Sequence, residues 1–287
     1  MDNILFTSIE LGLLYAPAVL GVFLTFKILN FPDLTIDGSI VCGAAATAIA
    51  ISQGVPGIFA LLFGLLAGVL AGTLTSFLHT YLKIGKILSG ILSLSILYTL
   101  NLRLMSGPNV SLLNNPKTIG LFNAPINHGL VVIFLFAIVV SLKFLLDWFL
   151  NTELGLTLRA TGDNEQIAKT FAIDINKTKG LGIVIGNGLA GLAGGLIAQF
   201  QGFADISMGT GTIVLVLASL MIGEAIVKGK KISAITTSLI LGSIVYQLII
   251  NIALRFGLAG SDLKLVTALI VILTIVIGDN RKKFFSL

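Results

Sequence analysis

Long apolar runs separated by short polar clusters constrain this chain more than any other feature of its sequence. Charged residues gather in the clusters and leave stretches of roughly 17 to 25 mostly apolar residues, the length that crosses the hydrocarbon core of a bilayer. Hydrophobic residues make up 56% of the 287 residues and charged residues only 11%, unlike the average soluble domain. The sequence therefore predicts an all-α polytopic membrane protein.

Hydropathy predicts about nine membrane-spanning helices, with eight to ten compatible with the pattern. The run after Met1 has no basic residues ahead of it, unlike a cleavable signal peptide, and is expected to be a true first helix. The predicted spans lie near residues 4–27, 38–52, 56–80, 86–105, 128–149, 178–200, 209–227, 233–254 and 263–278.

The basic residues predict the orientation of these spans, because cytoplasmic loops carry an excess of Lys and Arg. With residues 150–177 in the cytoplasm, only Arg103, Lys117, Arg255 and Lys264 fall outside. The N-terminus is then outside and the C-terminus is cytoplasmic, in a bacterial plasma membrane. The basic residues expected inside are Lys27, Lys83, Lys86, Lys143, Arg159, Lys169, Lys177, Lys179, Lys228, Lys230, Lys231, Arg281, Lys282 and Lys283.

Signatures of catalysis and of metal binding are missing from the sequence. Its histidines are His79 and His128, its one cysteine is Cys42, and no zinc-protease or hydrolase motif occurs. The segment from Gly223 to Lys231 resembles a phosphate loop, but it has one residue too many and lacks the hydroxyl that would bind magnesium. We therefore expect no enzymatic activity and no cofactor on this chain. ATP, if it drives the process, is expected to bind another subunit.

A short internal repeat marks two positions in the chain. The segment Phe31-Pro32-Asp33-Leu34-Thr35-Ile36 matches Phe203-Ala204-Asp205-Ile206-Ser207-Met208, 172 residues further on. Five predicted helices separate the copies, so they face opposite sides of the membrane, as inverted-topology repeats of transporters do. The pattern indicates two halves of inverted topology.

Each copy places a carboxylate and a hydroxyl at a break between apolar segments. A broken backbone at membrane depth persists only where protein buries it or where it lines an aqueous cavity. We therefore predict that these breaks are hinges on a translocation pathway; the alternative is a pair of ordinary helix-capping turns. The predicted hinge and pathway residues are Asp33, Thr35, Asp37, Asn187, Asp205 and Ser207.

Glycines and amides inside the predicted spans point to close helix packing. Gly64, Gly68 and Gly72 recur at intervals of four, as do Gly191 and Gly195, a spacing that lets helix backbones approach. Intramembrane amides such as Asn101 mark either pathway contacts or helix-to-helix hydrogen bonds.

The polar segment before the second half carries a recognisable pattern. It reads Gly155, Arg159-Ala160, Asn164, Ala168, Ala172-Ile173-Asp174, Asn176 and Lys179, followed by a glycine-rich run from Gly186 to Gly195. The pattern resembles the branched-chain amino acid and monosaccharide class of ABC importer permeases. Residues 26–38 and 201–209 are similar to its putative tryptophan/tyrosine permease subgroup. The position of Ala172 departs from related sequences, which commonly have glycine there.

This resemblance implies a set of partners and a docking element. The partners are a second permease subunit, in a homodimer or, as the open alternative, a heterodimer; two cytoplasmic ATPase subunits that bind the ATP; and an extracytoplasmic solute-binding protein. The homodimer is the expected form. Apolar residues among the charges of residues 155–179 allow that segment to lie in an ATPase groove. The residues expected to couple to the ATPase are Arg159, Asn164, Ala168, Phe171 and Ile173.

Together these features divide the chain into a first transmembrane half (1–150), a cytoplasmic coupling segment (151–179) and a second transmembrane half (180–287). The expected function is the import of a small polar solute, with an aromatic amino acid favoured by the subgroup resemblance. An ion-coupled secondary transporter is the alternative. It fits the repeat equally well but fits the coupling segment and the sparse buried charges less well.

Overall fold

The computed structural model describes residues 2–112, 128–226, 231–257, 262–263 and 265–272. Helices make up almost all of it, as the sequence predicts. In chain order the elements are α1 (Asp2–Val22), the π-helical η1 (Phe23–Ile28), α2 (Thr35–Ser52), α3 (Gly57–Thr80), α4 (Lys86–Met105), β1 (Asn109–Ser111), α5 (His128–Asn151), α6 (Glu153–Asp163), α7 (Glu165–Thr170), α8 (Ile175–Gln201), β2 (Phe203–Asp205), α9 (Thr212–Ile226) and α10 (Ile232–Arg255).

Seven helices of the described part of the chain are long and apolar enough to cross a bilayer: α1 with η1, α2, α3, α4, α5, α8 and α10. The predicted span at 209–227 is instead α9, a helix of 15 residues that is too short to cross by itself. The last predicted span, residues 263–278, lies only partly within the described residues. Within this span, residues 265–272 are helical. The polytopic helical fold is thus confirmed, although the predicted spans are not all full-length.

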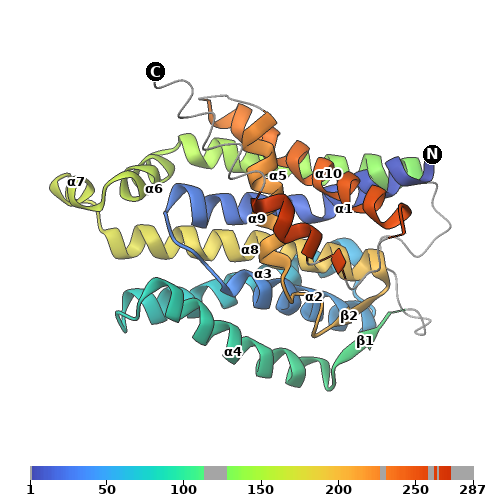
Figure 1. Ribbon diagram of the computed structural model, residues 1–287. Coiled ribbons are helices and arrows are strands. Elements are labelled where there is room, and N and C mark those ends of the chain that lie inside the picture. The colour runs from blue at the N-terminus through green and yellow to red at the C-terminus, as the bar shows by residue number, and fades with distance from the viewer. Residues whose placement is uncertain (1, 113–127, 227–230, 258–261, 264, 273–287) are drawn as a thin grey trace.

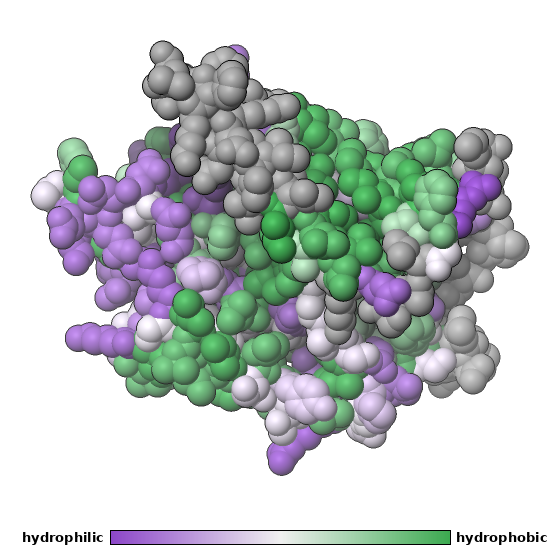
Figure 2. Space-filling model, in the orientation of Figure 1, coloured by the Kyte–Doolittle hydropathy of each residue, from purple (hydrophilic) through white to green (hydrophobic). Residues whose placement is uncertain are grey.

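The helices form one bundle with two distinct ends (Figure 1). The α6–α7 end carries the two short helices of the polar segment, and the β1–β2 end carries the short strands. Helices α1 and α10 lie antiparallel, because Ser243 donates to the carbonyl of Gly12 at 2.7 Å while Asn251 donates to Ser8 at 2.9 Å. Hydrophilic residues gather over α6 and α7, whereas hydrophobic residues cover much of the rest of the same face (Figure 2).

Helix α8 lies at the centre of the bundle, in contact with α1, α2 and α3. Glycines make this packing possible, because a Cβ atom at Gly43 or Gly68 would collide with the α8 backbone. A Cβ at Gly191 would lie 2.5 Å from the carbonyl oxygen of Gly64 and 2.8 Å from the Cα of Gly68. The predicted close approach of the glycine-bearing helices is therefore confirmed within one chain.

One short antiparallel ribbon interrupts the helical fold. Strand β1 pairs with β2, with Asn109 opposite Asp205 and Ser111 opposite Phe203. No regular element is predicted between the spans 86–105 and 128–149, so the strand at residues 109–111 is an addition to the predicted fold; residues 113–127 lie outside the described part. The pairing joins the segment after α4 to the second copy of the repeat.

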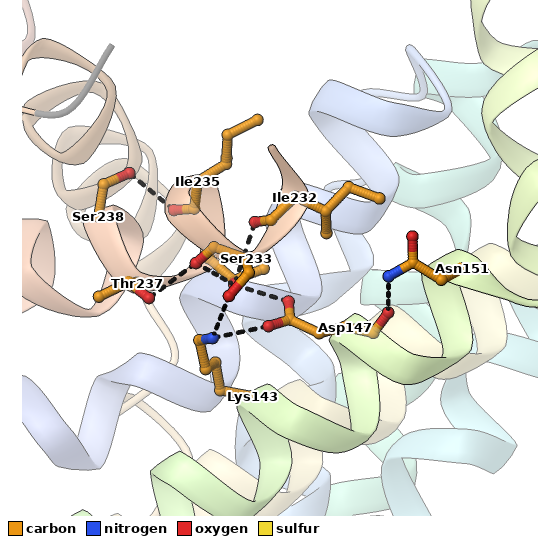
Figure 3. Close-up of polar contacts among 9 residues, drawn as sticks. Lys143, Asp147, Asn151, Ile232, Ser233, Ile235, Thr237 and Ser238 are labelled. Atoms are coloured by element: carbon orange, nitrogen blue, oxygen red, sulfur yellow. Dashed lines mark hydrogen bonds and ion pairs between the residues drawn. The ribbon is translucent and has the colours of Figure 1, made fainter. Parts of the chain in front are cut away.

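A buried ion pair within α5 makes hydrogen bonds to the start of α10 (Figure 3). The Lys143 ammonium lies 2.7 Å from the Asp147 carboxylate and donates to Ser233 at 2.8 Å, while Thr236 donates to Asp147 at 2.7 Å. Removing one partner of a buried ion pair leaves an uncompensated buried charge. Such a change lowers the stability of the fold more than the loss of an exposed ion pair does. Lys143 thus connects two helices inside the bundle, whereas the charge pattern predicts only that it lies toward the cytoplasmic side.

Candidate functional site

The first copy of the repeat lies in a buried hydrogen-bonded network at the start of α2. The Asp33 carboxylate accepts from the backbone N–H of Thr35 at 2.9 Å and from Asn187 Nδ2 of α8 at 2.6 Å. Asn187 in turn accepts from the Ser39 hydroxyl at 2.6 Å. Asp33, Thr35 and Asn187, three of the predicted hinge residues, therefore meet at one point, and each is at most 2% exposed.

Hydroxyl groups extend this network to two further helices. Thr35 Oγ1 lies 2.7 Å from Thr75 Oγ1 of α3, which donates to Ser93 Oγ of α4 at 2.8 Å. Sequence reasoning did not single out Thr75 or Ser93, although a run of hydroxyl residues inside predicted spans is a usable signal for helix-to-helix hydrogen bonds. Thr35, the first residue of α2, contacts Thr75, which lies five residues before the end of α3. Helix α2 therefore begins inside the bundle and not at its surface.

The second copy of the repeat repeats the local chemistry in another place. The backbone N–H of Ser207 donates to Asp205 Oδ1 at 2.7 Å, the same contact that Thr35 makes to Asp33. Asp205 is the last residue of β2, at the opposite end of the bundle from the first copy (Figure 1), and Ser207 is exposed. The two copies thus occupy opposite ends, as predicted, and do not contact each other.

Asp37 connects the regions that follow the two copies. Its carboxylate accepts from the backbone N–H groups of Gly211 at 3.0 Å and Ile213 at 2.7 Å, at the start of α9. Asp37 also lies in the first turn of α2, so one negative charge sits at the positive ends of two helix dipoles. Helices α2 and α9 therefore both begin inside the bundle, and they run toward opposite ends.

The direction of α9 follows from its far end. Glu224 pairs with Lys27 of η1 at 2.9 Å, near the α6–α7 end. Residues 206–211 must therefore turn back from the β1–β2 end into the bundle before α9 begins. Two broken helices of opposite direction, with their N-termini facing each other, form the arrangement that inverted repeats place around a transported ligand.

A cavity of about 400 Å³ lies at this junction. Its walls come from the first turns of α2, from one side of α4 and from residues 206–210, and they include Asp37, Tyr98 and Asn101. The volume lies within the range of small-molecule sites, about 300–1,000 Å³. The arrangement is suited to hold a small solute beside the N-termini of α2 and α9.

The coupling segment presents only part of its apolar surface. Leu154, Leu156 and Ile167 are each more than half exposed and Phe171 is 75% exposed, whereas Leu158 and Ala168 are buried against the chain itself. Of the other predicted coupling residues, Arg159 and Ile173 are half-buried and Asn164 is exposed. A partner protein that binds this segment would contact the exposed apolar residues directly. Leu158 and Ala168 would pack beneath them, inside the chain.

Polar side chains cap each helix of this segment. Thr152 caps α6, Asn164 accepts from the N–H groups of Gln166 and Ile167 at the start of α7, and Asp174 accepts from the N–H groups of Asn176 and Lys177 at the start of α8. These hydrogen bonds, chiefly that of Lys177, and the Lys177 ammonium hold the pKa of Asp174 below its usual range. The caps fix where each helix begins.

Direct contacts join the coupling segment to the loop that leads into α2. Asn30 Nδ2 donates to the carbonyl of Gly162 at 2.9 Å, and Lys86 Nζ donates to the carbonyl of Asn30 at 3.1 Å. Glu165 lies 2.7 Å from Lys179 and 3.8 Å from Lys86. Partial burial raises the pKa of Glu165, but these ammonium groups outweigh that effect and hold it below its usual range. A displacement of α6 or α7 therefore reaches the residues just before Asp33.

Ala172 occupies a backbone conformation that favours glycine. Its φ angle is +57°, where related sequences are expected to have glycine. We predict that Ala172→Gly stabilises the chain by about 1 kcal/mol, because a left-handed conformation costs an L-residue that amount. Thermal unfolding of the purified chain measures the change. The matched control, Ala160→Gly within α6, should destabilise by a similar amount; destabilisation by both changes would contradict the prediction.

Comparisons with known proteins identify what the chain is similar to. A family model described as "Branched-chain amino acid transport system / permease component" matches residues 4–277. The tyrosine transport system permease protein of Clostridioides difficile (strain R20291) is 42% identical over 268 residues, which cover 93% of this chain and 89% of that protein. The ribose import permease protein of Escherichia coli (strain K12) is 27% identical over 150 residues, covering 50% and 45% of the two chains. A solved chain from a metal-chelate type ABC transporter in an inward-facing conformation is 18% identical with a TM-score of 0.49, covering 96% and 83%.

Proposed function

The chain belongs to the branched-chain amino acid transport system permease family, and from that premise we propose that it is the membrane-spanning subunit through which an ATP-driven importer admits an aromatic amino acid. The observation that carries the choice of solute is the 42% identity to a tyrosine permease over nearly the full length of both chains. Tyrosine is therefore the first solute to test.

The arrangement of broken helices supports this role. Helices α2 and α9 begin inside the bundle beside a cavity, and Asp37 joins their N-termini. The predicted hinge residues divide into a buried cluster of Asp33, Thr35 and Asn187, the link made by Asp37, and a turn of Asp205 and Ser207 near the β1–β2 end. We propose that these three parts move relative to one another when the pathway alternates between its two openings.

Energy for the transport comes from other subunits in this proposal. Two ATPase subunits bind and hydrolyse ATP and seat the coupling segment, residues 151–179, through the exposed Leu154, Leu156, Ile167 and Phe171. A second copy of this chain completes the pathway, and an extracytoplasmic binding protein delivers the solute to the β1–β2 end. This chain itself carries no catalytic step.

The charge distribution supports an orientation. Lys27, Lys86 and Lys177 lie at or beside the ends of helices that face α6 and α7, whereas Arg103 and Arg255 lie in the last turns of helices that reach the other end. By the positive-inside rule the α6–α7 end is cytoplasmic. The N-terminus is then outside, and the C-terminus is placed in the cytoplasm of a bacterial cell.

Pull-down of the tagged chain from native membranes tests the proposal. We expect an ATPase to co-purify, and Phe171→Asp to reduce its recovery at least about tenfold, because a charge in a packed interface costs more than the roughly 1.4 kcal/mol of a tenfold change. Arg159→Glu should act in the same direction. Phe256→Asp is the matched control, since Phe256 is 86% exposed and follows α10 at the opposite end.

Tyrosine uptake by the same preparation shows which result would contradict the proposal. The wild-type complex in proteoliposomes should import tyrosine only when ATP is supplied on the ATPase side. A chain that purifies alone and imports tyrosine with an ion gradient as its only driving force would instead be a secondary transporter, and the proposal would fail.

A further inference from the structure

The cavity between α2, α4 and residues 206–210 contains a polar atom whose bonding is incomplete. Asn101, on α4, is 1% exposed and lines the cavity. Its Nδ2 donates to the carbonyl of Gly38 at 3.3 Å, and this contact sets which way the amide faces. Its Oδ1 has no hydrogen-bond partner among the described residues. A buried acceptor left unpaired costs about 1–3 kcal/mol, so a ligand that donates to this oxygen would recover that loss.

A second acceptor faces the same space. Both oxygens of Asp37 already accept a backbone N–H at the start of α9, but a carboxylate offers about four lone-pair sites. None of the described residues that line the cavity is Lys, Arg or His. The cavity therefore offers a carboxylate and an unpaired amide oxygen without a cation to balance them, and it favours a ligand group that is both a donor and positively charged.

The remaining walls favour an apolar body on that ligand. Val41, Leu94 and Ile206 supply aliphatic surface, and Tyr98 supplies an aromatic ring on the same side of α4 as Asn101. The positive group and the apolar body together describe a primary ammonium compound with a hydrophobic or aromatic side chain. No lining residue supplies a cation for its carboxylate, and among the lining side chains the hydroxyl of Thr210 is one neutral donor that could contact it.

We infer that this cavity is a solute-binding site within the permease, in which Asn101 Oδ1 and the Asp37 carboxylate receive the ammonium group of an amino acid while the apolar walls receive its side chain. The inference rests on the proposed function and adds to it a place and a recognition chemistry. Recognition there depends on the ammonium group more than on the carboxylate.

The test measures binding of radiolabelled tyrosine to the purified permease–ATPase complex in nanodiscs, without the binding protein. Asn101→Leu keeps the volume of the side chain but removes the acceptor, and it should lower tyrosine affinity at least tenfold. Asn101→Asp keeps an acceptor and should retain binding. Asn251→Leu removes an amide of α10 that donates to Ser8, and it should leave the affinity unchanged.

Competition by analogues gives a second readout that does not depend on the variants. Tyramine, which lacks the carboxylate, should displace tyrosine, and 3-(4-hydroxyphenyl)propionate, which lacks the ammonium, should compete at least tenfold less well. Tyrosine binding at wild-type affinity by Asn101→Leu, or equal competition by the propionate, would overturn the assignment.

Uptake assays separate failure of the site from failure of the function. If the wild-type complex imports tyrosine but does not bind it without the binding protein, or if Asn101→Leu imports it at wild-type KM, the cavity assignment is wrong and the proposed function stands. If the wild-type complex does not import tyrosine, the proposed solute is wrong and the inference built on it falls too.

Discussion

Replacement of Asn187 by leucine is expected to destabilise the chain by about 3 kcal/mol and to abolish solute import, because it removes the acceptor of the buried Ser39 hydroxyl and one of the donors to the buried Asp33 carboxylate. Asn187 donates to Asp33 and accepts from Ser39, and all three side chains are at most 2% exposed. Thermal unfolding of the detergent-solubilised chain and uptake by the reconstituted complex measure the two effects.

The control for this prediction is the same change at another amide. Asn251→Leu removes a half-buried amide whose Nδ2 contacts the hydroxyl of Ser8, so its cost should be closer to about 1 kcal/mol, the average for one hydrogen bond. Equal losses of stability at the two positions would show that the Asp33–Asn187–Ser39 network contributes no more to the stability of the fold than a single hydrogen bond.

Replacement of Gly191 by valine is expected to prevent correct packing of α8, at a cost of about 3 kcal/mol or more. A single Cβ at this position already lies 2.5 Å from the Gly64 carbonyl oxygen, and the neighbouring atoms are backbone, which cannot rotate aside. Low recovery of monodisperse protein, together with a lower Tm for whatever folds, is the expected measurement.

Gly85 provides the comparison for this packing prediction. A Cβ at Gly85, before α4, meets nothing within 4 Å, so Gly85→Val should be recovered at the wild-type level. Recovery of Gly191→Val at the same level would mean that α3 and α8 can separate without loss of the fold.

The membrane-spanning fold could be predicted because hydropathy and helix length are local properties of the sequence. The predicted spans 56–80 and 86–105 agree with α3 and α4 to within one residue. Helix α9 shows the limit of that approach. The predicted span 209–227 includes residues 209–211, which precede α9 and belong to the segment that turns back into the bundle, so hydropathy did not separate that segment from the helix that follows it.

The sequence pointed to some of the polar residues of the candidate site, but not to the contacts that they make. Repetition identified Asp33 and Asp205, and the structure gives both the same contact to the residue two positions later. The link from Asp37 to Ile213 spans 176 residues and is made to a backbone N–H, which leaves no mark in the side-chain pattern. Likewise, only packing reveals that Leu158 faces inward and Phe171 outward.

The ribbon of β1 and β2 has a consequence for how the cavity changes shape. Residues Pro108 and Gly202 extend the pairing, through hydrogen bonds to Ile206 at 2.9 Å and Leu112 at 2.8 Å, so the end of α4 and the start of residues 206–210 form one frame. These two walls of the cavity cannot separate at that end unless the hydrogen bonds between β1 and β2 break. At its other end α4 is held by side-chain contacts, such as those of Lys86 to the carbonyl of Asn30 and to Glu165. If the coupling segment moves during transport, as proposed above, we expect the end of α4 near Lys86 to shift more than the end held by the ribbon, which would change the angle of α4 beside the cavity.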